Sequence, residues 1–172
     1  LWNWKKYFNS KRNDRINSLG TMSKFLLQEK YKQLYKILNS NKNQKIFIIT
    51  GKNSFYKSGA NKIIENVLKK KTNKIYFKKK SVPEFNELIE IYKNLNNFKP
   101  DIFLAIGGGA VLDYAKMANC INSLENLDKK IVKQTIKLKK NFRLIAIPTT
   151  AGSGAEVTSN AVIYIKNVKF SL

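Results

Sequence analysis

Four short runs of apolar residues, separated by longer amphipathic segments, constrain the fold of this chain most strongly. The runs are 45–50, 75–77, 102–106 and 144–147. Short strands that are apolar throughout are typical of a parallel sheet covered by helices on both faces. Apolar residues recur at helical spacing between the runs, which predicts helices at 60–68, from Pro83 to about Pro100, at 110–119 and, more weakly, at 124–138. The alternation predicts an α/β fold, a doubly wound parallel sheet flanked by helices.

The two ends of the chain depart from this pattern. Residues 1–22 form a separate N-terminal segment with no firm element, and a helix is expected from Ser23, so that one domain covers 23–172. At the other end, two apolar runs flank Lys166-Asn167, which predicts a C-terminal β-hairpin. The sequence stops within an apolar pattern, which suggests truncation of a longer protein.

Three loops with unusual compositions follow predicted strands: 51–54, 107–109 and 148–154. The carboxyl ends of parallel strands lie on one edge of a sheet, and ligands of such sheets bind there. We therefore expect the three loops to lie on one rim and to face one ligand.

Gly107, Gly108 and Gly109 follow a buried strand and open a helix. Backbone N–H groups without side chains can approach a ligand closely, and the helix start adds positive partial charge, so a pyrophosphate fits there. A tight turn that needs positive φ angles explains three glycines equally well. The motif is neither the Gly-x-Gly-x-x-Gly fingerprint nor a P-loop. Further along this helix, Asp113 and Lys116 are three residues apart and can pair, either at the site or as a surface ion pair.

A second motif, Pro148-Thr149-Thr150-Ala151-Gly152-Ser153-Gly154-Ala155-Glu156-Val157-Thr158, follows the fourth strand. Hydroxyls spaced by small residues can donate to phosphate and ribose oxygens where the backbone passes close. Alone, this stretch is better explained as an ordinary polar loop.

Together the two motifs, Gly-Gly-Gly-Ala-x-x-Asp-x-Ala-Lys and Pro-Thr-Thr-Ala-Gly-Ser-Gly-x-Glu-Val-Thr, resemble the iron-containing (group III, metal-dependent) alcohol dehydrogenase family. The resemblance runs from about Lys45 to Leu172. It implies a Rossmann-like NAD(P)-binding domain that transfers a hydride between NAD(P)H and a small alcohol or aldehyde. The stretches 154–156 and 161–172 look closer to members acting on phosphonate aldehydes (phosphonoacetaldehyde-reductase-like) or sugar-like substrates than to ethanol or glycerol dehydrogenases. A polar or anionic aldehyde would suit the positive charge.

The resemblance implies a role for each matching position. The glycines and the residue after them, here Ala110 where relatives usually carry Ser, contact the pyrophosphate, and Asp113 and Lys116 match the family's helix pair. The two threonines and the next hydroxyl line the adenosine and phosphate side, and three further positions lie near the nicotinamide and its ribose. The adenosine and phosphate group is Thr149, Thr150 and Ser153. The nicotinamide group is Asn160, Val162 and Lys169.

Gly51 stands where many relatives carry an Asp that holds the adenosine ribose and repels a 2′-phosphate. Without that acid, Lys52 and Ser54 can bind a phosphate. Charge therefore favours NADP over NAD.

The family binds Fe²⁺ or Zn²⁺ through one Asp and three His in a helical C-terminal domain, and the metal polarises the substrate oxygen. This sequence contains no His, so it provides no such metal ligands and no catalytic residues, and we expect the helical metal-binding domain to be absent. The 172 residues alone are then expected to bind cofactor without turnover.

The net charge of +22 raises a different possibility, a basic nucleic-acid-binding module. Thirty of the 33 basic residues are Lys, whereas base recognition favours Arg, so nucleic acid is the disfavoured partner. An inactive fragment of the family and a dehydroquinate-synthase-like lyase are further alternatives. A single cysteine suits a cytoplasmic protein, no apolar run is long enough to span a membrane, and a homo-oligomer is compatible with the sequence.

Overall fold

The computed structural model describes residues 32–41, 43–150 and 152–172. The chain divides into two units, 1–40 and 41–172. In the first unit, residues 32–39 are helical, as the spacing of Leu34 and Leu38 predicts. The expected helix start at Ser23, the boundary at residue 22 and the remainder of that unit lie outside the described residues.

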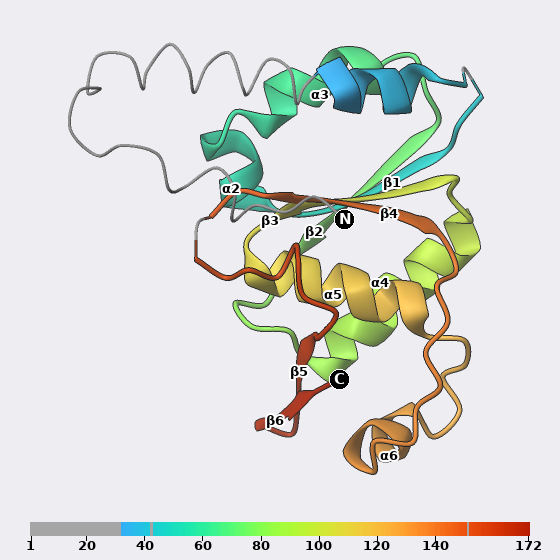
Figure 1. The fold of residues 1–172 in the computed structure, drawn as a ribbon, viewed down its shortest axis with the longest axis vertical. Helices are drawn as coiled ribbons and strands as arrows, with labels where there is room; N and C mark the ends of the chain where they lie inside the picture. Colours follow the sequence, from blue (N-terminus) through green and yellow to red (C-terminus); the bar gives the residue numbers. More distant parts are fainter. Residues whose placement is uncertain (1–31, 42, 151) are drawn as a thin grey trace, which may run out of the picture. The chain divides into compact units, whose positions relative to one another are not determined.

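The second unit is an α/β structure built on a four-stranded parallel sheet, as predicted (Figure 1). The order across the sheet is β2-β1-β3-β4. The strands are β1 (Ile46–Gly51), β2 (Asn73–Lys78), β3 (Ile102–Gly107) and β4 (Arg143–Pro148). The helices are α2 (Lys52–Lys57), α3 (Ala60–Leu68), α4 (Phe85–Phe98), α5 (Gly109–Cys120) and α6 (Leu127–Val132). The predicted hairpin is present as β5 (Val162–Ile165) and β6 (Val168–Ser171).

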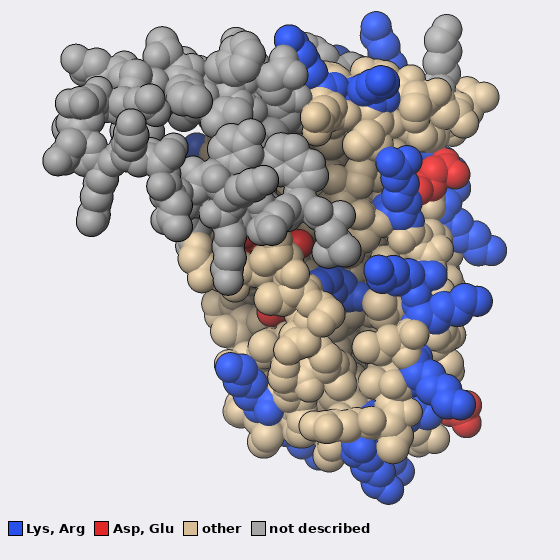
Figure 2. Space-filling view, viewed as in Figure 1, with Lys and Arg blue, Asp and Glu red and all other residues tan. Residues whose placement is uncertain are grey.

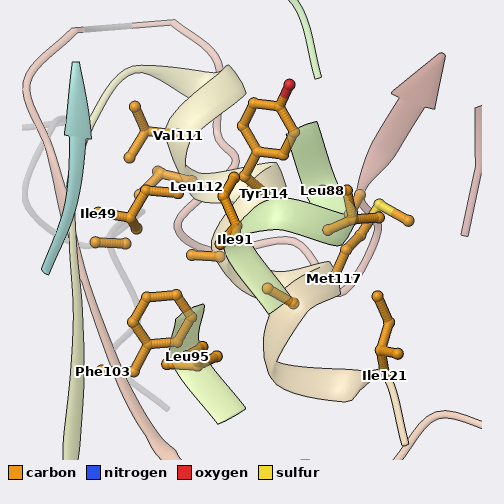
Figure 3. Close-up of a cluster of buried hydrophobic side chains, with 14 of the residues drawn as sticks. Ile49, Leu88, Ile91, Leu95, Phe103, Val111, Leu112, Tyr114, Met117 and Ile121 are labelled. Carbon is orange, nitrogen blue, oxygen red and sulfur yellow. The ribbon is translucent and has the colours of Figure 1, made fainter. Parts of the chain in front are cut away.

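The central strands β1 and β3 are apolar on both sides because helices cover both faces of the sheet. In Figure 1, α2 and α3 lie on one side, and α4 and α5 lie on the other. The larger part of the core joins α4 and α5 to the sheet. Figure 3 shows Ile49 beside Val111 and Leu112 of α5, and Phe103 beside Leu95 of α4. Burial of a large apolar side chain contributes about 1.5–3 kcal/mol, so this layer fixes the position of α5.

The hairpin is attached to the start of α4. Its turn residues Lys166 and Asn167 both have positive φ, 49° and 66°, as in the turns that match the twist of two-residue hairpins. The N–H of Tyr164 donates to the carbonyl of Pro83 at 2.7 Å, and the side chain of Ile163 is completely buried. The hairpin therefore belongs to the second unit.

Two predicted helices differ from their observed forms. Pro83 does not lie in the first turn of α4 but precedes its N-cap, Glu84, because the segment is extended there and pairs with β5. The fully buried face of α4 is Glu87, Leu88, Ile91 and Leu95, whereas the large apolar side chains of Phe85, Ile89 and Tyr92 are only half-buried. The stretch 124–138 is helical only in α6, which ends before Gln134, where φ is 53°.

No helix in the described ranges has both the length and the apolar character needed to cross a membrane.

Candidate functional site

The carboxyl ends of the four parallel strands place the predicted loops on one rim. Gly107 pairs with Pro148 across β3 and β4, and Gly51 pairs with Lys78 across β1 and β2. This confirms the common rim for the loops at 107–109 and 148–154. The third segment, 51–54, is not a loop: β1 runs through Gly51 and α2 begins at Lys52, because Phe55 is buried and its ring meets that of Phe77 at 6.1 Å.

The three glycines of the rim are required for space and not for positive φ. None of them has a positive φ, and Gly108 lies at φ −80° and ψ −174°. A Cβ on Gly107 would lie 2.5 Å from Cγ2 of Val111, and one on Gly108 would lie 2.9 Å from Oγ1 of Thr150. The tight-turn explanation is therefore wrong for this motif: a close approach of α5 and of the second motif excludes side chains here.

Gly108 is the N-cap of α5 and provides no side-chain cap. Its carbonyl accepts the N–H groups of Val111 and Leu112 at 3.0 and 3.2 Å. The N–H groups of Gly109 and Ala110 have no hydrogen-bond partner in the described part of the chain. Unpaired amides and the positive end of a twelve-residue helix together favour an anion at this point.

The threonine motif lies directly against the glycines. The N–H of Thr149 donates to the carbonyl of Gly107 at 3.0 Å, and a Cβ on Gly109 would meet Cβ of Ser153 at 3.3 Å. The two glycines of this motif, Gly152 and Gly154, do have positive φ, 98° and 60°. The structure thus brings together two motifs that are about 40 residues apart in the sequence.

The hydroxyl of Thr149 has no partner. Its Oγ1 is buried and forms no hydrogen bond in the described structure. A buried hydroxyl without a partner costs about 1–3 kcal/mol by mutational measures. An atom that carries this cost, in a motif that packs on the start of α5, is placed to donate to a bound molecule, whereas the hydroxyls of Thr150 and Ser153 belong to exposed residues.

Asp113 and Lys116 pair with each other, as their spacing predicts, at 3.2 Å. The pair is not a solvated surface pair, because the two side chains are only 15% and 17% exposed. The Lys116 ammonium also donates to the carbonyl of Asn160 and lies 3.4 Å from Oγ1 of Thr158. It therefore links α5 to the segment that enters the hairpin, and Asn160 takes part through its backbone.

The remaining predicted residues lie away from these contacts. Val162 is half-buried and pairs with Ser171 in the hairpin. Lys169 lies opposite Tyr164 on β6 and is exposed. Within the described residues, no hydrogen bond or ion pair joins Val162 or Lys169 to either motif. Beside β1, the hydroxyl of Ser54 donates to the carbonyl of Gly51 at 3.0 Å.

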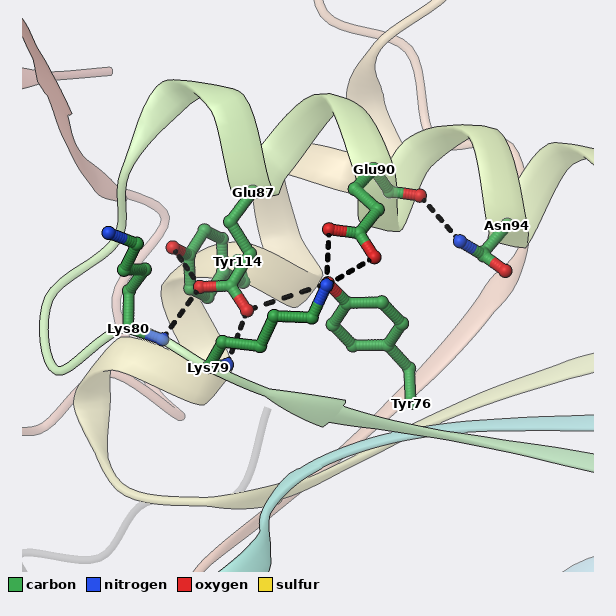
Figure 4. A network of polar contacts seen from close by, with 7 residues as sticks. All are labelled: Tyr76, Lys79, Lys80, Glu87, Glu90, Asn94 and Tyr114. Carbon is green, nitrogen blue, oxygen red and sulfur yellow. Dashed lines mark hydrogen bonds and ion pairs between the residues drawn. The ribbon is translucent and has the colours of Figure 1, made fainter.

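A buried carboxylate that the sequence analysis missed, that of Glu87, lies between α4, α5 and the bend after β2 (Figure 4). Glu87 is 4% exposed. Its carboxylate accepts the N–H groups of Lys79 and Lys80 at 2.5 and 3.0 Å, the hydroxyl of Tyr114 at 2.7 Å and, at the longer distance of 3.5 Å, that of Tyr76. Four donors from β2, its following bend and α5 therefore converge on one side chain. Helical spacing could have found it, because Glu87 precedes Ile91 and Leu95 by four and eight residues.

The two tyrosines of this network are held neutral. Burial raises the pKa of Tyr114 and that of Tyr76, and in both the negative charge of Glu87 adds to the effect. The Tyr114 hydroxyl also accepts the N–H of Glu84 at 2.7 Å. Outside the network, a hydrogen bond from Lys79 lowers the pKa of Glu90. The negative charge of Glu87 is thus stabilised by hydrogen bonds from two backbone amides and two neutral tyrosine hydroxyls.

Other chemistry is sparse in the described residues. They hold no group of three or more His, Cys, Asp or Glu that could bind a metal ion, so they do not fit a metal held by Asp and three His. Cys120 is half-buried, and burial raises the pKa of its thiol.

Residues 24–172 match the family described as iron-containing alcohol dehydrogenase. The chain belongs to this family. Aldehyde-alcohol dehydrogenase 2 of Entamoeba histolytica is 33% identical over 134 residues, which are 69% of this chain and 15% of that protein. The 4-hydroxybutyrate dehydrogenase of Clostridium kluyveri is 33% identical over 84 residues, which are 49% of this chain and 22% of that protein.

Solved structures show the same fold. The NADH-dependent butanol dehydrogenase A of Thermotoga maritima superposes with a TM-score of 0.70 at 22% identity, over 83% of this chain and 37% of that chain. The present chain therefore spans well under half the length of each of these three relatives. The family assignment agrees with the resemblance in the two rim motifs.

Proposed function

We propose that the second unit binds NAD(P) at the carboxyl rim of its sheet, as the cofactor-holding part of a metal-dependent alcohol dehydrogenase or aldehyde reductase. One observation carries this proposal: the buried, unpartnered Oγ1 of Thr149 lies in a motif that packs on glycines at the start of α5. An absent hydrogen-bonding ligand explains the orphaned hydroxyl, and the glycines allow its motif to pack directly against the start of α5.

The roles follow from what each group can do. The N–H groups of Gly109 and Ala110 would hold the pyrophosphate, with Gly107 and Gly108 keeping the approach open. Thr149 would donate its hydroxyl to a phosphate or ribose oxygen, with Thr150 and Ser153 at the exposed side. Asp113 and Lys116 would hold the segment that enters the hairpin. Asn160, Val162 and Lys169 of that region would then lie beside the nicotinamide. The bound cofactor would supply the hydride donor or acceptor.

Gly51, Lys52 and Ser54 would receive the adenosine ribose. No carboxylate stands at the end of β1 to repel a 2′-phosphate, so we propose that NADP is preferred over NAD. The Ser54 hydroxyl already donates its proton to the Gly51 carbonyl. It must rotate away from that carbonyl before it can donate to a phosphate. The electrostatic attraction therefore rests on lysine.

The substrate class follows from the family only. We propose a small alcohol or aldehyde, with a polar or anionic aldehyde, such as a phosphonate aldehyde, suited to the positive charge. Because the described residues do not fit the family's metal, the 172 residues are expected to bind cofactor without turnover. We place the protein in the cytoplasm on its single cysteine, and a homo-oligomer remains part of the same proposal.

Nucleic acid is the competing ligand suggested by charge. Figure 2 shows Lys and Arg side chains spread from top to bottom of the visible face and separated by uncharged surface. A nucleic-acid site gathers basic residues in one stripe or patch. Several lysines are also paired with carboxylates, including Lys69 with Glu65 at 3.2 Å. The distribution favours a solvated surface.

Thermal melting with NADPH, NADH and duplex DNA, each in about 0.15 M salt to screen charge, tests the proposal. A ligand at about 100 times its Kd stabilises a protein by about 2.7 kcal/mol. We expect both dinucleotides to raise the melting temperature, NADPH more, and DNA to leave it unchanged. Stabilisation by DNA alone would refute the proposal, and so would no response to either dinucleotide.

Thr149→Val provides the sharper test. The variant removes the orphaned hydroxyl and keeps the shape, so the unliganded protein should be as stable as wild type or slightly more so. Dinucleotide affinity should fall about 10- to 100-fold, since a hydrogen bond to a charged group contributes about 1.5–3 kcal/mol. Thr135→Val, at an exposed residue beyond α6, should change neither property. Unchanged affinity in Thr149→Val would exclude the hydroxyl from the site.

A further inference from the structure

Three consecutive lysines, Lys78, Lys79 and Lys80, end β2 and begin the bend after it. Lys78 pairs in register with Gly51 of the neighbouring strand β1. A Cβ on Gly51 would lie 3.8 Å from Cε of Lys78. The stem of this lysine therefore lies beside the position where a carboxylate would exclude a 2′-phosphate.

The three lysines differ in their partners. The ammonium of Lys79 pairs with Glu90 at 2.7 Å, and that of Lys80 pairs with Glu84 at 3.3 Å. Lys78 instead donates to the carbonyls of Lys80 and Ser81, at 2.5 and 3.5 Å, and has no carboxylate partner among the described residues. Of the three charges, the one beside Gly51 is thus the one left without a counter-charge.

The bend that holds Lys78 is fixed by the buried carboxylate of Glu87. It accepts the N–H groups of Lys79 and Lys80, as Figure 4 shows, and so orients the Lys80 carbonyl that receives the Lys78 ammonium. Glu87 also accepts the hydroxyl of Tyr114, which comes from the helix that begins at the glycine motif. The position of Lys78 is therefore coupled to the proposed pyrophosphate site.

We propose that Lys78 is the residue that selects NADP(H), by binding the 2′-phosphate of its adenosine ribose. This inference rests on the proposed dinucleotide site. Nucleotides lie across strand ends on this kind of rim, with an acid for a ribose diol or a basic side chain for a 2′-phosphate. β2 lies two strands from β3, about 10 Å from the glycine motif. A lysine is a compact charge on a flexible stem. The Lys78 ammonium can therefore exchange its hydrogen bonds to two carbonyls for hydrogen bonds to a phosphate.

Lys78→Met tests the proposal, with Lys74→Met as its matched control. Lys74 lies on the same strand and the same face but at the amino end, and it is exposed, so both variants lose one charge. The Kd values for NADPH and NADH are measured in about 0.15 M salt. Lys78→Met should weaken NADPH about 10- to 100-fold and NADH less than about twofold, whereas Lys74→Met should change both less than twofold. Lys78→Arg should retain the preference for NADPH.

Each other result is decisive. An equal loss of both dinucleotides in Lys78→Met, at an unchanged melting temperature, would refute selection by Lys78 and indicate a general electrostatic effect. Wild-type affinities in Lys78→Met would refute the inference and leave the dinucleotide site standing. If the wild-type protein bound neither dinucleotide, the proposed function and the inference would both fail.

Discussion

Replacing Glu87 with Gln should destabilise the protein far more than an isosteric change normally does. The carboxylate accepts four donors from β2, its following bend and α5. An amide has one oxygen to offer and turns its own N–H donors toward backbone N–H groups. Losing one charge-assisted hydrogen bond costs about 1.5–3 kcal/mol, and leaving a buried donor unsatisfied costs about 1–3 kcal/mol. We expect a loss of about 2–4 kcal/mol in the free energy of unfolding.

A double-mutant cycle with Tyr114→Phe separates the network from a general effect of the substitution. Urea denaturation of wild type, both single variants and the double variant gives the four free energies. Because the Tyr114 hydroxyl and the Glu87 carboxylate meet at 2.7 Å, the double variant should lose less than the sum of the single variants. A coupling energy of about 1–2 kcal/mol is expected for groups in one network.

Glu125→Gln is the control, because Glu125 is exposed and surface changes usually stay within about 0.5 kcal/mol. If Glu87→Gln were as mild as Glu125→Gln, the carboxylate would not hold the bend. If the single variants added within about 0.5 kcal/mol, Tyr114 and Glu87 would act independently, and the coupling of α5 to the bend after β2 would be refuted.

Three further outcomes are expected. Gly107→Ala should lose about 1–3 kcal/mol in urea denaturation, because its Cβ would lie 2.5 Å from Cγ2 and 2.7 Å from Cβ of Val111; a loss within the roughly 0.5 kcal/mol of an ordinary surface change would contradict the steric reason. Cys120 should react with a maleimide at pH 7 more slowly in the folded protein than in urea, because burial raises the pKa of its thiol; equal rates would contradict this. Tyr76 and Tyr114 should stay protonated where exposed tyrosines ionise, since their folded-state pKa values are raised. Their contribution to stability is then complete below about pH 10 and lost as pH rises further, and one ultraviolet titration step near pH 10 for all tyrosines would refute it.

The sheet could be predicted from sequence because its signal is local. Each strand contains a short apolar run, and β1, β3 and β4 end at Gly or Pro. Parallel pairing then places the following loops on one rim without further information. The hairpin is predictable for the same reason, since Lys166 and Asn167 are flanked by two apolar runs. The errors lie where tertiary contacts decide. The backbone before α4 is extended by pairing with β5, and α2 forms at Lys52 because Phe55 packs against Phe77.

The buried carboxylate illustrates a different limit of sequence reasoning. Charged residues are almost never fully buried without partners, so a Glu beside Leu88 is assigned to solvent by default. Its partners are two backbone amides eight and seven residues earlier and two hydroxyls, one 11 residues earlier and one 27 residues later. Backbone donors carry no residue identity, so no residue pattern could have indicated them. Only the fold shows that they converge.

The glycine motif shows why two individually weak motifs are specific when they occur together. Three glycines alone are explained equally well by a tight turn. A threonine-rich stretch alone is explained by a polar loop that is exposed to solvent. In the structure, side chains on Gly108 and Gly109 would meet Thr150 and Ser153 of the second motif. The two motifs therefore constrain each other. The second motif can lie this close only because residues 108 and 109 have no Cβ, and a larger residue there would contact Thr150 or Ser153. A substitution that enlarges the first motif should then be rescued by one that shortens the second, which no independent turn would allow.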